Sequence, residues 1–153
     1  MIIAMGSDHR GFDSLKHIAD HLRSKGHDVR ILGPDAHETC DYPDAAYLVA
    51  AAVAAGEAEF GVLMDGTGIG SCIAANKVRG VRAALLNDEL SAQMSRSHND
   101  ANVVCLPADL LGVRLMFAII ETCLNTPFSA GRHARRNEKI AAIERGENPA
   151  SPA

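Results

Sequence analysis

Short apolar runs alternate with segments of helical periodicity along almost the whole chain of 153 residues. In the first cycle, residues 2–5 form an apolar run, and Phe12, Leu15 and Leu22 then recur at helical spacing before Gly26. The other strands are predicted at 29–32, 60–64, 81–86 and 103–106. Further helices are predicted at 45–55, 88–96, 110–124 and 132–145. This alternation predicts a single α/β domain in which helices cover both faces of a parallel sheet.

Charge and cysteine usage exclude several classes of protein. The formal charge is −4, so no basic surface for nucleic acid is expected. No apolar run approaches the roughly 20 residues that cross a bilayer, and the amino terminus lacks the positive segment of a signal peptide. The four cysteines, at 40, 72, 105 and 123, form no CxxC pair, which predicts reduced thiols in a cytoplasmic protein. The domain is predicted to span 1–145, followed by a Pro- and Ala-rich disordered tail at 146–153.

Polar segments follow two of the predicted strands, where parallel α/β folds bind their ligands. Ser7-Asp8-His9-Arg10-Gly11 can bind hydroxyls and phosphate, or simply cap the next helix. Asp65-Gly66-Thr67-Gly68-Ile69-Gly70-Ser71 leads into a helix, and its glycines can bring N–H groups close to a phosphate or an enediolate oxyanion. A plain tight turn also fits this loop. A nucleotide site is disfavoured, because the first turn lacks GxGxxG and no P-loop lysine follows.

Two further segments carry groups suited to chemistry. His98 lies between Arg96 and Asp100, and histidine as a residue type suits acid–base work, although an ordinary loop histidine also fits. Arg132 and Arg136 are four residues apart on one helix face, and they form either a fork for phosphate or a solvated basic face.

Taken in order, these segments resemble a known family. They are joined by Asp41-Tyr42-Pro43, Ala74-Ala75-Asn76-Lys77 and Gly131-Arg132-His133. Over about residues 1–145 the chain resembles the type B ribose-5-phosphate isomerases and the two subunits of galactose-6-phosphate isomerase. The resemblance implies a Rossmann-like, doubly wound, five-stranded parallel sheet, in a homodimer or tetramer with active sites shared between subunits. It also implies interconversion of ribose 5-phosphate and ribulose 5-phosphate through an enediolate, without metal or cofactor.

The resemblance further implies roles for single residues. His98 matches the group that opens the furanose ring, and Gly66–Ser71 match a backbone cradle for the enediolate oxygen. Asp65, at the base position, and Thr67 complete the predicted catalytic set. The predicted substrate-binding residues, which match sugar and phosphate contacts, are Asp8, His9, Tyr42, Gly66, Gly68, Gly70, Ser71, Asn99, Arg132 and Arg136.

Two positions depart from the family pattern. Many members have a cysteine base where this chain has Asp65, and another branch has a glutamate base at the position of Ser71. We expect desolvation to raise the pKa of Asp65 into a useful range. After the fifth strand the family usually has a phosphate-binding arginine, where this chain has Asp109. That residue either shifts substrate preference away from ribose 5-phosphate or caps a helix beginning near Leu110.

Three functions are therefore open at this point. The first is an isomerase that acts alone on ribose 5-phosphate or a closely related phosphosugar. The second is one subunit of a hetero-oligomeric isomerase of the galactose-6-phosphate type. The third is a phosphosugar-binding protein without turnover.

Overall fold

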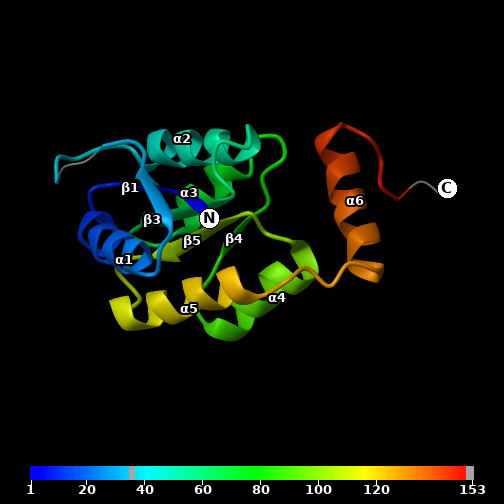
Figure 1. The fold of residues 1–153 in the computed structure, drawn as a ribbon. Helices are drawn as coiled ribbons and strands as arrows, with labels where there is room; N and C mark the ends of the chain where they lie inside the picture. The colour runs from blue at the N-terminus through cyan, green and yellow to red at the C-terminus, as the bar shows by residue number, and fades with distance from the viewer. Residues whose placement is uncertain (35–36, 151–153) are drawn as a thin grey trace.

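The computed structural model describes residues 1–34 and 37–150, and its elements follow the predicted alternation (Figure 1). The strands are β1 (Ile2–Ser7), β2 (Asp28–Ile31), β3 (Phe60–Asp65), β4 (Ala83–Leu85) and β5 (Val103–Pro107). The helices are α1 (Phe12–Ser24), α2 (Tyr42–Ala54), α3 (Ile69–Ala75), α4 (Glu89–Asn99), α5 (Val113–Asn125) and α6 (Arg132–Glu144).

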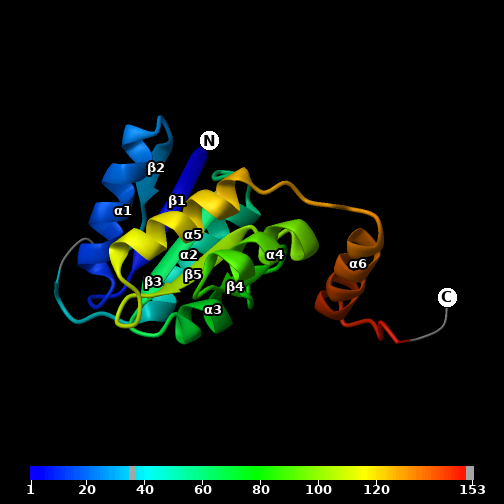
Figure 2. The same cartoon turned by 90° about the horizontal axis from the view of Figure 1, so that it is seen from below.

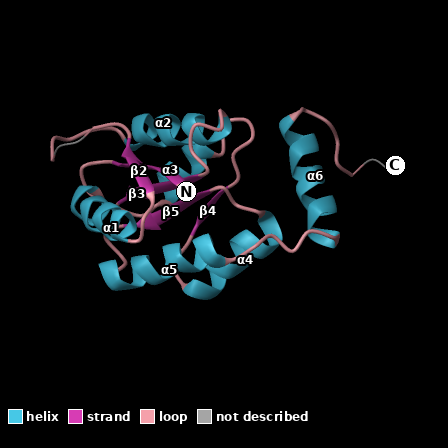
Figure 3. Cartoon of the chain, viewed as in Figure 1, coloured by secondary structure: helices cyan, strands magenta, loops and turns pink. Residues whose placement is uncertain are grey.

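The strands form one parallel sheet in the order β2-β1-β3-β5-β4 (Figure 3). The chain passes from β1 to β2 on one side and then returns to place β3 on the other side of β1. The strand order therefore changes direction between β1 and β3, and such a switch is where open α/β sheets bind ligands. The prediction of a doubly wound parallel sheet is confirmed.

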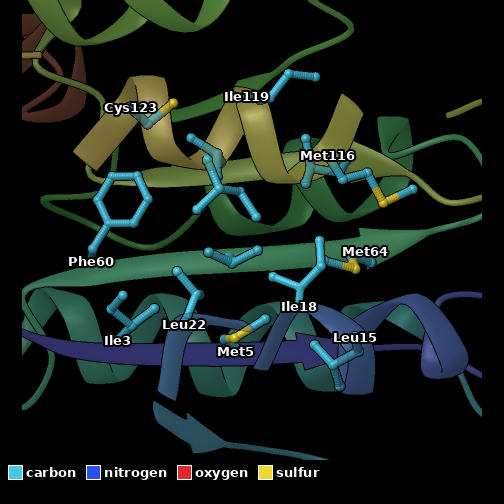
Figure 4. Close-up of a cluster of buried hydrophobic side chains, with 14 of the residues drawn as sticks. Ile3, Met5, Leu15, Ile18, Leu22, Phe60, Met64, Met116, Ile119 and Cys123 are labelled. Carbon is cyan, nitrogen blue, oxygen red and sulfur yellow. The ribbon is translucent and has the colours of Figure 1, made fainter. Parts of the chain in front are cut away.

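Each face of the sheet packs on its own set of helices, because successive side chains of a strand point to opposite faces. Ile3 and Met5 of β1 belong to a cluster with apolar residues of α1, α4 and α5, part of which Figure 4 shows. Ala4, between them, belongs to a second cluster with small residues of α2 and α3. Burial on both faces explains why the central strands β1, β3 and β5 are apolar almost throughout rather than alternating.

Two helix boundaries change the interpretation of site residues. Helix α4 continues to Asn99 and ends at Asp100, whose φ of 47° is left-handed. His98 thus lies in the last turn of a helix, and its interpretation as a loop histidine is wrong. Helix α5 has Gly112 as its N-cap, so the hypothesis that Asp109 caps this helix is also wrong.

Helix α6 stands apart from the sheet, beside the end of α4, in both views of the ribbon (Figures 1 and 2). Its one buried residue is His133, while Ile140 and Ile143 are exposed. Of the predicted tail, residues 151–153 lie outside the described part of the chain. Within that part, the carbonyl of Pro149 accepts a hydrogen bond from Lys139. No helix formed by the residues described is long and apolar enough to cross a membrane.

Candidate active site

The segments that follow β1, β3 and β5 meet around one hollow at the carboxyl edge of the sheet. This hollow is lined by Asp8, Arg10, Tyr42, Asp65, Gly66, Thr67, Ile69, Gly70, Ile73 and Asp109. Most predicted site residues from the first half of the chain are thus brought together. His9 is not in this lining, and its Nδ1 accepts a long hydrogen bond, 3.5 Å, from the N–H of Cys40. Within the residues described, no three His, Cys, Asp or Glu side chains gather closely enough to hold a metal ion.

Asp65 ends β3 with a side chain that is 4% exposed, and the loop after it closes around the carboxylate. Its Oδ1 accepts hydrogen bonds from the N–H groups of Thr67, at 2.8 Å, and Gly68. Its Oδ2 accepts one from the N–H of Ser71 at 2.9 Å, and the Thr67 hydroxyl donates a long one, 3.4 Å, to Oδ1. A side chain at Gly70 would place Cβ 2.5 Å from the ring of Tyr42, so glycine there lets the loop pack against that ring.

These contacts determine the direction in which the pKa of Asp65 is shifted. Burial by itself raises the pKa of this carboxyl group, but hydrogen bonds from Ser71, Thr67 and Gly68 to the charged form outweigh it. The pKa of Asp65 therefore lies below its ordinary value. The prediction of a raised pKa for Asp65 is wrong, because the hydrogen-bond donors of the loop outweigh the effect of desolvation.

The same contacts occupy much of the predicted cradle for the enediolate oxygen. The N–H groups of Thr67, Gly68 and Ser71 all bond to Asp65, so a substrate oxygen has to use other donors of the loop. A carboxylate offers about four acceptor sites, and the loop fills them. To accept a proton from a substrate, Asp65 has to release one donor. The Thr67 hydroxyl can leave by rotation alone, without backbone movement.

An ion pair that sequence analysis did not identify lies on the β5 side of the hollow. Nε of Arg10 donates to Oδ2 of Asp109 at 2.8 Å, and Nη2 donates to the same oxygen. The hydrogen bond and charge of Asp109 raise the pKa of Arg10. In the sequence, this ion pair is indicated by the acidic residue at 109 and by the arginine in the segment after the first strand.

Two further predicted residues, His98 and Asn99, lie near the end of α4 at the opposite, amino edge of the sheet. The guanidinium of Arg96 in α4 lies 5.7 Å from the ring centroid of Phe60, which begins β3. The carbonyl of Asn99 accepts a hydrogen bond from Arg82, immediately before β4. Asp65 stands at the far end of β3, about 16 Å away at roughly 3.3 Å per residue. One chain therefore holds His98 and Asn99 on one edge and Asp65 on the other.

His98 is instead joined to the start of α6. Its ring stacks on that of His133 with centroids 4.0 Å apart and planes 7° from parallel. Burial lowers the pKa of His133, and the nearby His98, Arg132 and Arg136 lower it further. A neutral His133 can stack on His98 without repulsion between like charges. The structure thus groups four predicted residues around the end of α4 and the start of α6. They are His98, Asn99, Arg132 and Arg136, and we call them the residues of the amino edge.

Comparison with known proteins places these two groups in context. Residues 3–140 match the family described as Ribose/Galactose Isomerase. The chain is 43% identical to ribose-5-phosphate isomerase B of Escherichia coli, over 95% of this chain and 98% of that protein. It is 42% identical to D-erythrulose-4-phosphate isomerase of Pectobacterium atrosepticum, over 95% and 96%. Its fold matches the crystal structure of Mycoplasma genitalium ribose-5-phosphate isomerase B with bound ribulose 5-phosphate, with a TM-score of 0.91, 41% identity and coverage of 94% and 96%.

Proposed function

Because the chain belongs to the ribose/galactose isomerase family, we propose that it interconverts ribose 5-phosphate and ribulose 5-phosphate. The reaction moves a proton between C2 and C1 through an enediolate, while a hydroxyl proton moves between O2 and O1. The observation that carries this proposal is the hollow at the strand-order switch, where Asp65 and the glycine loop adjoin Asp8 and Tyr42. It combines a proton acceptor and groups for hydroxyls in one place.

In the proposed mechanism Asp65 is the base and the glycine loop positions it. Oδ1 of Asp8 accepts hydrogen bonds from the N–H groups of Arg10 and Gly11, at 2.9 and 3.1 Å. Its other oxygen, Oδ2, is the one we assign to a sugar hydroxyl. Rotation of the Thr67 hydroxyl away from Asp65 exposes an acceptor site to the substrate carbon and makes the carboxylate a stronger base, since it loses a stabilising donor.

We further propose that each complete site is shared between two copies of the chain in a homodimer. Within one chain the length of β3 separates Asp65 from His98, so the residues of the amino edge need a second subunit to reach a sugar in the hollow. Ile69 and Ile73, 52% and 58% exposed, line that hollow and offer apolar surface for a partner. A cytoplasmic location is part of the same proposal, supported by four cysteines that are all free.

Replacing His98 by asparagine tests its role in ring opening. We expect His98→Asn to lose more activity on ribose 5-phosphate, which closes to a furanose, than on a four-carbon phosphosugar that cannot close in this way. The measurement is kcat/KM on both sugars, with exposed His17→Asn as the matched control. Equal losses on both sugars would instead assign His98 to binding.

The function itself is tested with the purified chain alone. Coupled assays on four-, five- and six-carbon phosphosugars should give turnover, highest with ribose 5-phosphate or ribulose 5-phosphate. Turnover that needs a second, homologous chain would support the hetero-oligomeric alternative. Phosphosugar binding without turnover under every condition would support a binding protein. A preference for four carbons would place the chain nearer its erythrulose-phosphate relative.

A further inference from the structure

We propose that Arg10 binds the phosphate of the substrate and that Asp109 is its positioning residue. The inference rests on the proposed isomerase function and deepens it. Arg10 follows β1 and Asp109 follows β5, so the pair crosses the end of β3 between them. It therefore lies directly beside the loop that holds Asp65.

Backbone contacts hold both partners of the pair in place. The N–H of Arg10 donates to Asp8 at 2.9 Å, and the N–H of Asp109 donates to the carbonyl of Gly66 at 3.0 Å. A Cβ atom built on Gly66 would lie 2.7 Å from Oδ2 of Asp109 and 2.9 Å from Nε of Arg10. The absence of a side chain at Gly66 thus leaves room for the ion pair against the backbone of the loop.

The charges around the hollow give Arg10 its role. Among the described residues that line it, Arg10 alone carries a positive charge, and three carboxylates accompany it. The carboxylates of Asp8 and Asp65 accept hydrogen bonds from backbone N–H groups. The carboxylate of Asp109 accepts hydrogen bonds from the guanidinium of Arg10. A phosphate ester carries close to two negative charges and is repelled by uncompensated carboxylates. The guanidinium has five N–H donors, and the edge not used by Asp109 can bind phosphate oxygens.

Stability does not explain the pair. The side chain of Arg10 is 56% exposed and that of Asp109 is 37% exposed, and ion pairs in such surroundings contribute little to folding. The pair holds the long side chain of Arg10 in one orientation beside the loop that follows Asp65. Asp109 thus acts through Arg10 and does not repel the phosphate as an unpaired carboxylate would.

Substitution of Arg10 gives the first test. Arg10→Ala should raise KM for ribose 5-phosphate by about 10- to 100-fold, the range for loss of a charged hydrogen bond, with a much smaller change in kcat. The matched control is Arg30→Ala, which breaks a similarly exposed arginine–aspartate pair, with Asp28, on β2. Asp109→Ala should raise KM for ribose 5-phosphate less than Arg10→Ala does. The double variant Arg10→Ala/Asp109→Ala should be no worse than Arg10→Ala, since a positioning residue has no effect without the group it positions.

Calorimetric titration with inorganic phosphate gives a second readout that does not depend on turnover. Phosphate should bind the wild type and the Arg30→Ala variant equally, and bind Arg10→Ala at least 10-fold more weakly. If the wild type proves inactive, the proposed function fails while this titration still tests Arg10.

Three results would overturn the assignment. One is an unchanged KM and unchanged phosphate affinity in Arg10→Ala. Another is a loss confined to kcat with phosphate affinity intact, which would place the guanidinium at the enediolate instead. The third is a wild type that binds no phosphate. If the alanine variant is poorly folded, as judged by its Tm, Arg10→Gln replaces it in each measurement.

Discussion

Asp65→Asn is expected to lower kcat by about three orders of magnitude, in the range that loss of a general base produces. The amide keeps the size of the carboxylate but cannot accept a proton from a substrate carbon. Steady-state kinetics on ribose 5-phosphate measure the loss, and Asp20→Asn, which changes an exposed aspartate of α1, is the matched control. Near-normal turnover in Asp65→Asn would remove this residue from the role of base.

The same variant should also be less stable, because Asp65 organises the loop. The asparagine NH2 group cannot accept the N–H of Ser71, so we expect the free energy of unfolding to fall by about 1–3 kcal/mol. The folded pKa of Asp65 is lowered, so its stabilising contribution is present above the unfolded pKa, about 3.9, and is lost as pH falls below it. Denaturant unfolding between pH 3 and 7 should therefore show a shallower acid-side loss for Asp65→Asn than for the wild type.

Replacing Asp65 by cysteine distinguishes a role as the base from a role in organising the loop. If Asp65 is the base, Asp65→Cys should recover more kcat than Asp65→Asn and become sensitive to iodoacetamide. If the carboxylate only organises the loop, both variants should be equally inactive. The comparison needs a Cys72→Ala background, since hydrogen bonding to Cys105 lowers the pKa of the Cys72 thiol to about 7 and makes it reactive.

Mixing two inactive variants should restore about one quarter of the wild-type activity if the sites are shared between subunits of a symmetric dimer. We choose Asp65→Asn and Arg136→Ala, which change opposite edges of the sheet. Half of the randomly exchanged dimers are then hybrids, and each hybrid has one site with both native residues. Subunit exchange is verified by native mass spectrometry before activity is measured.

The control for this experiment is a mixture of Asp65→Asn with Asp8→Asn. Both residues line the same hollow of one chain, so every site in a hybrid contains one substitution and no recovery is expected. Absence of recovery in the Asp65→Asn and Arg136→Ala mixture, after verified exchange, would show that sites are completed within one chain.

Several features of the site followed from local patterns in the sequence. Residues 60–64 were predicted as a strand because a strand covered by helices on both faces has to be apolar throughout. Asp65 and the glycines after it were then expected at its carboxyl end, and the structure places them there. The predicted helix at 88–96 ends too early, because polar residues continue the helix to Asn99.

Local patterns thus suffice to predict the alternating elements, the parallel sheet and the loops that carry polar groups, since apolar periodicity is set by which faces must be buried. Three features depend instead on the tertiary structure. It placed His98 on the opposite edge from Asp65, it directed the loop donors at the Asp65 carboxylate, and it paired Arg10 with Asp109. Each depends on strand order and on contacts between residues distant in sequence. Hydrophobic periodicity, a local property, carries no information about such contacts.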